Sequence, residues 1–297
     1  MGCGKTFSLK KIAKASSHFR LFKIWVSEGV TVKVVNNTSQ TKRTLIDSFR
    51  GFLAELPLIK PLSTPKEIDL KCDGKYFGRY GCSLVFKEGG SVIYWSWVER
   101  ETYRDYLYCF FRLKELGYIV KSVTSDKHGS VIGAVKTAFP DVPHQYCLVH
   151  IQRRCQTLLT KRPDTKEGQA LLRLVKVINI IKSKNDEIVF RKWLENYEND
   201  NIAFLSQKTY GRKLDGGRTW WYTHRDVRMA FRHIKTSLEH MFLYLEDPNI
   251  SKDTNGLEAE FTHLKTKLNM HRGLSRERRS DFVYWYWFLK STYNNSG

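Results

Sequence analysis

Two aspartates in strand-like segments are the first residues whose type and placement suggest chemistry. Asp73 lies in the segment LKCDGKYF, and Asp126 lies at the end of the segment SVTSDKHGS. If both segments form neighbouring central strands, the two carboxylates come close together and repel each other unless a cation separates them. Mg²⁺ prefers such hard oxygen ligands, with waters and substrate phosphates completing its shell. The pair predicts a site for Mg²⁺ or Mn²⁺, although most aspartates at strand ends are caps or turn residues.

A third carboxylate is predicted on a helix that begins at about Asn255. Its apolar stripe has the spacing i, i+4, i+7 and i+11, and Glu258 lies at the margin of that packed face, beside Thr262 and Lys265. We expect Glu258 to reach a site at the sheet edge and Glu260 to point elsewhere. The alternative for Glu258 is a solvated helix residue. The stripe consists of Leu257, Phe261, Leu264 and Leu268.

The elements that must position these carboxylates follow from the sequence pattern after a proline-rich stretch at 57–65. Alternation predicts three strands joined by hairpins within 67–99, with a turn at Glu88-Gly89-Gly90. A helix ending at Gly117, a strand, a helix stopped by Pro140 and a short strand running into a helix follow. This β-β-β-α-β-α-β-α order predicts an α/β layer with a mixed sheet.

The chain is predicted to divide into a small all-α domain, a linker, an α/β core and an α-helical insertion within that core. The insertion is expected because its sequence is strongly charged and helical, with no strand signal. The predicted bounds are 1–56 for the N-terminal domain, 57–66 for the linker, 67–160 and 247–297 for the core, and 161–246 for the insertion.

The N-terminal domain is predicted to be a helix-turn-helix. Its sequence reads as a helix, a short second helix, a polar turn and a basic third helix, which Thr41 or Ser39 could cap. An ordinary three-helix packing unit is the alternative. In the DNA-binding interpretation the third helix faces a major groove, with these exposed residues on its outer side: Lys42, Arg43, Thr44 and Arg50.

The charge balance indicates a polyanionic partner. The chain has 50 Lys and Arg against 30 Asp and Glu, a net charge of +20, which favours nucleic acid over a merely solubilising surface. No apolar run approaches the roughly 18–20 residues needed to span a bilayer, and the N-terminus lacks the apolar region of a signal peptide. Six cysteines sit mostly in apolar segments, which favours reduced thiols in a cytosol. We therefore expect no membrane partner.

The first ten residues, MGCGKTFSLK, suggest three other functions. A phosphate-binding loop is excluded, because its first glycine would fall before the start of the chain. The N-myristoylation pattern is formally complete, and Cys3-Gly4 resembles the end of a zinc knuckle. A second zinc hypothesis comes from four residues close in sequence, but the strand-to-helix transition would splay their side chains; they are His144, Cys147, His150 and Cys155.

Four sequence blocks in order resemble the catalytic core of the Mutator-type DDE transposases of bacterial insertion sequences. The blocks are DGKYF at 73–77, TSDKHGSV at 124–131, QYCLVH at 145–150 and TNGLEAEF at 254–261, with HRGL at 271–274. The resemblance covers roughly residues 66–290. It implies a ribonuclease-H-like fold in which Asp73, Asp126 and Glu258 are the catalytic, metal-binding carboxylates. It also marks Cys147, His150 and Asn255 as signature residues of uncertain role.

The resemblance further implies how the protein works and where. Two metal ions would activate water and then a 3′-hydroxyl for phosphoryl transfer on double-stranded DNA, both element ends and target. Lys265 and Arg272 are candidate phosphate contacts, and Trp220 and Trp221 could stack on an unpaired base, although core packing is their more common use. We expect a homodimer or higher oligomer on DNA, in the bacterial cytoplasm and associated with the nucleoid.

Some relatives carry a zinc ribbon before the helix-turn-helix. MGCGKT is interpreted as the stump of such a ribbon, either lost or cut off by the choice of start, so we expect no zinc there; in a bacterial protein the myristoyl hypothesis lapses. Two functional alternatives remain open. One is a ribonuclease-H-like nuclease that cuts without strand transfer. The other is a non-catalytic DNA-binding regulator derived from a transposase.

Overall fold

The computed structural model describes residues 9–36, 41–211, 217 and 219–294. They form a mixed α/β structure in two compact units. Unit 1 contains the described residues up to Ile68, then Cys72–Ile119, and those from Gly256 onward; unit 2 contains Asp69–Lys71 and Val120–Asn255. The units group elements by packing, and the predicted division into four segments stays a prediction.

One five-stranded sheet has the order β3-β2-β1-β4-β5. The predicted sequence of elements is confirmed, from the three hairpin-joined strands to the short last strand. β2 and β3 pair antiparallel, and β4 and β5 pair parallel. The elements are β1 (Lys66–Tyr76), β2 (Cys82–Glu88), β3 (Ser91–Val98), α4 (Tyr103–Glu115), β4 (Tyr118–Ser125), α5 (Gly129–Ala138), β5 (His144–Tyr146) and α6 (Leu148–Leu159).

In unit 1, strand β2 is buried along almost its whole length, because successive side chains meet helices on opposite faces. On one face Phe86 packs against Phe110 of α4, with 5.7 Å between ring centroids. On the other face Val85 joins the core formed with the two C-terminal helices, α10 (Asn255–Met270) and α11 (Arg276–Asn294). Trp287 of α11 donates a hydrogen bond to the Ser83 hydroxyl on that same face.

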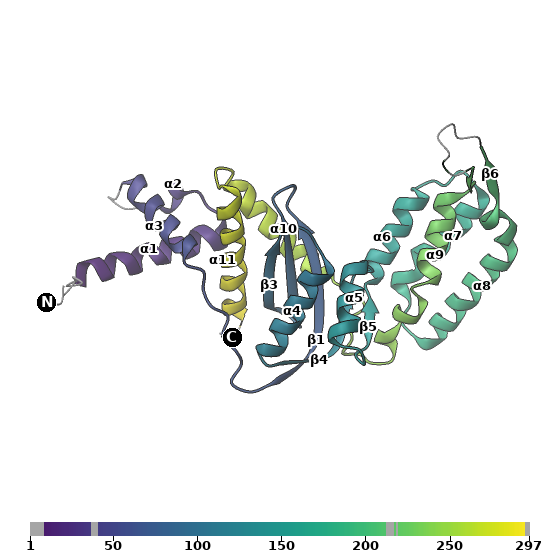
Figure 1. Cartoon of the computed structure of the whole chain (residues 1–297), viewed down its shortest axis with the longest axis horizontal. Helices are drawn as coiled ribbons and strands as arrows, with labels where there is room; N and C mark the ends of the chain where they lie inside the picture. Colours follow the sequence, from purple (N-terminus) through teal and green to yellow (C-terminus); the bar gives the residue numbers. More distant parts are fainter. Residues whose placement is uncertain (1–8, 37–40, 212–216, 218, 295–297) are drawn as a thin grey trace. The chain divides into compact units, whose positions relative to one another are not determined.

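The three predicted N-terminal helices are present as α1 (Leu9–Glu28), α2 (Val32–Val35) and α3 (Lys42–Ala54). They share one hydrophobic core with α10 and α11 (Figure 1). The Phe22 and Trp285 rings meet edge to face at 5.2 Å, and Trp285 Nε1 donates to the Phe52 carbonyl oxygen. The three helices are therefore packed as part of unit 1 rather than around a core of their own.

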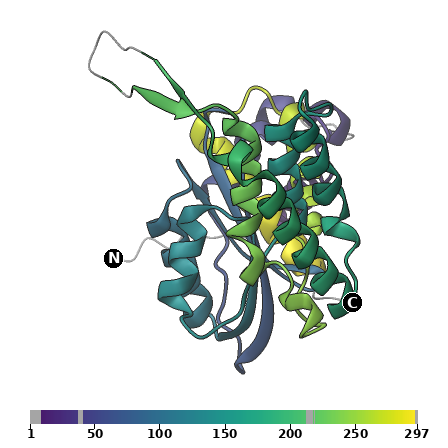
Figure 2. The same cartoon turned by 90° about the vertical axis from the view of Figure 1, so that its right-hand side faces the viewer.

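Unit 2 carries the long segment between β5 and α10. It contains α7 (Lys166–Val177), α8 (Lys184–Ser206) and α9 (Arg225–Lys235), packed with α6 around one apolar core. The sequence predicted helices throughout this segment, and that prediction was wrong at one place. β6 (Lys208–Tyr210) and β7 (Trp220–Tyr222) pair antiparallel and extend from the helices (Figure 2). The aromatic run Trp220-Trp221-Tyr222 favours a strand over a helix.

The insertion returns to the sheet through two short 3-10 helices, η2 (Leu238–His240) and η3 (Leu243–Leu245). Fully buried Gln145 of β5 donates to the Met241 carbonyl oxygen and accepts from the Leu243 amide. His240 Nδ1 donates to the His144 carbonyl oxygen at 3.0 Å. These bonds satisfy buried polar groups on both sides, so the end of the insertion is fixed to β5.

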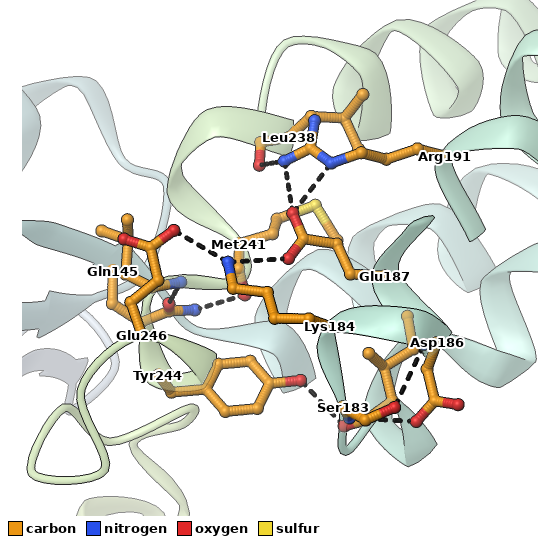
Figure 3. Close-up of polar contacts among 12 residues, drawn as sticks. Gln145, Ser183, Lys184, Asp186, Glu187, Arg191, Leu238, Met241, Tyr244 and Glu246 are labelled. Atoms are coloured by element: carbon orange, nitrogen blue, oxygen red, sulfur yellow. Dashed lines mark hydrogen bonds and ion pairs between the residues drawn. The ribbon is translucent and has the colours of Figure 1, made fainter. Parts of the chain in front are cut away.

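Helix α8 holds the same return segment through a buried carboxylate, Glu187, which is 7% exposed (Figure 3). Arg191 donates to Glu187 at 2.8 Å and to the Leu238 carbonyl oxygen at 3.0 Å. Lys184 bridges Glu187, at 3.1 Å, to Glu246, at 2.8 Å. Charge-assisted hydrogen bonds of this kind are stronger than neutral ones.

Replacing Glu187 by alanine should destabilise unit 2. Arg191 and Lys184 would lose a buried partner, and because both cations are half exposed the expected loss is only about 1–2 kcal/mol. Urea denaturation followed by circular dichroism measures this loss. The matched control is Glu195→Ala on the exposed side of the same helix, which should change stability by less than about 0.5 kcal/mol. Equal denaturation midpoints for the two variants would contradict the assigned role of Glu187.

None of the described helices is both long and apolar enough to cross a membrane.

Candidate active site

Asp73 lies near the end of β1 in unit 1 and is 7% exposed. Its Oδ1 accepts a hydrogen bond from the Gly74 amide at 2.8 Å. A second carboxylate lies beside it: a Cβ on Gly74 would stand 3.1 Å from Glu101 Oε1. Glu101 in turn accepts from the Tyr106 hydroxyl at 2.6 Å. Sequence reasoning missed Glu101, because the residue precedes a helix and belongs to no motif.

The pKa of the buried Cys82 thiol depends on the charges around Asp73. Burial raises the pKa of Cys82 strongly, and the negative charges of Glu101 and Asp73 raise it further. Two carboxylates acting on one buried thiol indicate a region of negative potential at this end of β1. Glycine at position 74 fits the space, since a side chain there would meet Glu101 and Leu84.

Asp126 directly follows β4 in unit 2. Burial raises the pKa of its carboxyl group, while the nearby His150 and His128 rings and the His128 amide lower it. The His128 amide donates to Asp126 Oδ1 at 3.3 Å. The predicted signature residue His150 is thus an electrostatic neighbour of the predicted catalytic residue Asp126.

Asp126 lines a cavity of about 360 Å³ in unit 2. Helix α6 supplies one wall with four polar residues at i, i+3, i+4 and i+7, the spacing of a single helix face. The opposite helix face, with Leu148, Ile151, Cys155 and Leu159, is buried in the core. The lining residues are Asp126, Lys127, His128, His150, Arg153, Arg154, Thr157 and His233.

A second signature residue, Cys147, holds the chain that leads into α10. Its buried Sγ accepts hydrogen bonds from the amide and hydroxyl of Thr254, at 3.4 and 3.5 Å. The Leu148 amide donates to the Lys252 carbonyl oxygen, and the Thr124 hydroxyl donates to that of Ser251. Thr254 is the first residue of the sequence block that contains Glu258. One member of the Cys-x-x-His pair, Cys147, is therefore hydrogen-bonded to this segment, and the other, His150, lies near Asp126.

Helix α10 confirms the predicted apolar stripe, because Leu257, Phe261, Leu264 and Leu268 are all buried. Glu258 lies at the margin of that face and is half-buried. Glu260 has a different role. Its side chain, 14% exposed, forms ion pairs with Lys87 of β2 and Lys290 of α11, so it ties α10 to unit 1.

The predicted carboxylates are divided between the units: Asp73 and Glu258 belong to unit 1 and Asp126 to unit 2. Their convergence stays a prediction. Within the described ranges, no group of three or more His, Cys, Asp or Glu side chains is placed to hold a metal ion. Among the four residues of the second zinc hypothesis, His144 and Cys155 have protein partners: His144 Nε2 is hydrogen-bonded to the Ser125 hydroxyl, and Cys155 Sγ donates to the Ala230 carbonyl oxygen.

The predicted DNA contacts are at the surface. Lys42, Arg43, Thr44 and Arg50 are exposed on α3, which Thr41 caps, and Arg50 pairs with Asp47. Lys265 and Arg272 are also exposed. The contacts of these residues with DNA stay predictions. Asn255, a signature residue of uncertain role, is exposed as well, and its amide donates to Asp253. Ser39 and the first eight residues, with the supposed ribbon stump, lie outside the described residues.

Residues 133–267 match the model of the Transposase IS66 family. The match supports a transposase function for this protein. It covers less than half of the chain, running from α5 through the insertion to α10, and it contains Cys147, His150 and Glu258 but neither aspartate. It does not confirm the Mutator-type specification. Comparison with curated proteins finds no match.

Removing the sulfur acceptor at Cys147, within the matched segment, should loosen Thr254. In Cys147→Val the side chain keeps a similar volume but the Thr254 amide and hydroxyl lose their partner, at an expected cost of about 1 kcal/mol. Hydrogen exchange of a peptide covering residues 251–257 should be faster than in the wild type. Cys147→Ser retains an acceptor and should show a smaller effect. Unchanged exchange in Cys147→Val would remove the basis for the proposed anchoring.

The buried His144 of β5 should make the stability of the protein sensitive to acid. Burial, together with neighbouring His240, lowers the pKa of His144 from 6.5 to about 3. The unfolded chain therefore binds a proton below pH 6.5 that the folded chain refuses, so stability is full above pH 6.5 and falls as the pH drops toward 3. The slope from this one group is at most about 1.4 kcal/mol per pH unit.

The measurement is the free energy of unfolding of wild type and His144→Asn between pH 7 and pH 4. The difference between the two proteins should shrink as the pH falls, because the variant lacks this titrating group. A constant difference over the whole range would show that His144 does not carry the linkage.

Proposed function

We propose that this protein is a DDE transposase that cuts insertion-sequence ends and joins the freed 3′-hydroxyl to target DNA. The chemistry is phosphoryl transfer, with Asp73, Asp126 and Glu258 as the catalytic carboxylates. The proposal includes a ribonuclease-H-like catalytic core, a helix-turn-helix around α3 and a homodimer or higher oligomer on DNA. Such a protein works on nucleoid DNA in the bacterial cytoplasm.

One observation carries the proposal. Residues of three motif blocks that are distant in sequence meet within unit 2: Thr124 lies on β4, two residues before Asp126, Cys147 directly precedes α6, and Thr254 lies four residues before Glu258. Direct hydrogen bonds join the segment at 251–254 to both of the other blocks. A chance set of short sequence matches would not be expected to make mutual contacts, and the matched family segment covers two of the three blocks.

The sheet and the charge support the same function. The strand order β3-β2-β1-β4-β5, with β2 and β3 antiparallel and β4 and β5 parallel, fits the ribonuclease-H-like arrangement that the resemblance implies. The net charge of +20 suits a DNA substrate. The Mutator-type assignment rests on the sequence blocks from DGKYF to HRGL, whereas the family match names IS66; both support a transposase.

Three carboxylates are a hard oxygen donor set of the kind that Mg²⁺ or Mn²⁺ prefers, so Asp73, Asp126 and Glu258 would hold the ions. Such ions, when bound, would supply Lewis-acid stabilisation of the entering and leaving oxygens. The protein's own contribution is to keep these carboxylates in place. The Gly74 amide orients Asp73, the His128 amide orients Asp126, and Cys147 anchors the approach to Glu258.

The proposed reaction on DNA has two steps, strand cleavage and strand joining. Water attacks a phosphorus atom at the element end, and the 3′-oxygen leaves as a 3′-hydroxyl. That hydroxyl then attacks a phosphorus atom of the target strand, a new phosphodiester bond forms, and the target's own 3′-oxygen leaves. Both steps use one site, so a defect in any of the three carboxylates affects cutting and joining together.

Neutral substitutions at these carboxylates test the proposal. Asp73→Asn, Asp126→Asn and Glu258→Gln should each lower Mg²⁺-dependent cleavage and joining by about 100-fold or more, since each weakens the hold on the ions that would stabilise the reacting phosphate. DNA binding should be retained, because a negative charge near the phosphates is removed. The control is Asp141→Asn, an exposed residue of unit 2 outside the proposed site.

The assay uses a labelled duplex from the DNA flanking the reading frame, with a plasmid target. Cleavage without joining would favour the simple nuclease, and Mg²⁺-independent binding without cleavage by the wild type would favour the regulator. Wild-type activity in Asp73→Asn would show that the wrong aspartate has been assigned.

A further inference from the structure

The cavity beside Asp126 has an arrangement of charge that the catalytic carboxylates do not explain. Two cationic side chains, Arg153 and Arg154, line it from the polar face of α6, and both residues are exposed. Asp126 is the one carboxylate among the described residues that line the cavity. The cavity therefore offers more positive than negative charge to a ligand.

The third cation of the cavity, Lys127, is already committed to the protein. Its Nζ donates to the His233 carbonyl oxygen at 3.1 Å, the Thr236 hydroxyl at 2.6 Å and the Ser237 hydroxyl at 2.8 Å. These acceptors lie at the C-terminal end of α9, where the helix dipole places partial negative charge. Lys127 thus neutralises the wall that would otherwise repel an anion.

The opposite wall is also compatible with an anion. His233 of α9 has its pKa lowered to about 4 by burial and by the nearby charges of Lys127 and Arg154, so its ring is neutral at pH 7. Arg154 makes no ion pair or hydrogen bond with any described residue, and its guanidinium group affects the pKa of both His233 and Cys155. Its charge is available to an incoming group.

We propose that this cavity binds a backbone phosphate of the DNA substrate, with Arg153 and Arg154 as the charged contacts and the Thr157 hydroxyl as a further donor. A volume of about 360 Å³ accommodates a nucleotide-sized group, and planar guanidinium groups suit phosphate oxygens. The inference rests on the proposed function and deepens it. It assigns α6 to holding the strand next to Asp126, so that the bond to be cut is presented to the carboxylate.

The test compares Arg153→Gln/Arg154→Gln with a control that removes two cations from the exposed face of the neighbouring helix α7, Arg173→Gln/Lys176→Gln. Binding to the element-end duplex is measured by fluorescence anisotropy without divalent ions at several salt concentrations. We expect the cavity variant to bind about 10-fold more weakly than the control variant, with a salt slope lower by about 1 to 2. Circular dichroism shows whether both variants are folded.

A second measurement locates the contact even if the double variant is unstable. Single neutral methylphosphonates are scanned along the duplex against wild type, Arg153→Gln and Arg154→Gln. One position next to the cleavage point should weaken wild-type binding and have little effect on the single variants. A scan with no such position, or equal binding by cavity and control variants, would overturn the proposal.

Two further outcomes separate the proposals. Normal cleavage by the wild type together with unchanged DNA affinity in the cavity variant would overturn this inference and leave the transposase proposal standing. If the wild type does not cleave DNA but the cavity variant shows the expected loss of affinity, the cavity proposal stands and the transposase proposal is overturned. Inorganic phosphate that binds the wild type, but does not compete with DNA, would assign the cavity to a small anion and overturn the DNA contact.

Discussion

The structure of unit 2 depends on one constraint: a chain that leaves the sheet after β5 must return to it 92 residues later (238 − 146), at η2, in a fixed position. Buried polar groups meet that constraint. Gln145 holds the return segment on the sheet side, and the ion pairs of Glu187 hold it on the side of α8. The anchor at Cys147 then fixes the last residues before α10. Because unpaired buried polar groups are costly, other positions of the return segment are disfavoured.

This constraint also gives the insertion a role beyond its own packing. Lys127 follows Asp126 immediately, and its three hydrogen bonds reach the end of α9. The position of the loop after β4 is therefore set partly by a helix that begins almost a hundred residues later. A change in the packing of α9 would be transmitted to the Asp126 loop through a single side chain.

Much of the fold could be predicted from the sequence, because local patterns determine it. Alternation identified the strands, glycine and proline marked the ends of helices, and the stripe from Leu257 to Leu268 gave the buried face of α10. The hairpin of β6 and β7 was missed, because three-residue strands are too short for a period to appear. The shared core of Phe22 and Trp285 was missed because it joins opposite ends of the chain.

The candidate site was predictable only in part, for a similar reason. Asp73, Asp126 and Glu258 stand in recognisable blocks, and the structure describes each of them. Glu101 has no motif, and it lies beside Gly74 only because α4 packs on the sheet. The hydrogen bonds of Cys147 could not be inferred from the Cys-x-x-His spacing, since their donor is Thr254. The ion pairs of Glu260 could not be inferred either, because Lys87 and Lys290 lie on other elements.

The core shared by the first and last helices has a consequence for synthesis of the protein. Phe22, Trp25 and Phe49 pack against Phe282 and Trp285 of α11, at the far end of the chain. On the ribosome α1 and α3 are made well before α11, so their aromatic faces stay uncovered until α11 has been translated. A nascent or prematurely terminated chain exposes these apolar side chains to chaperones and proteases. Synthesis of α11 is thus a condition for a stable core around α1 and α3.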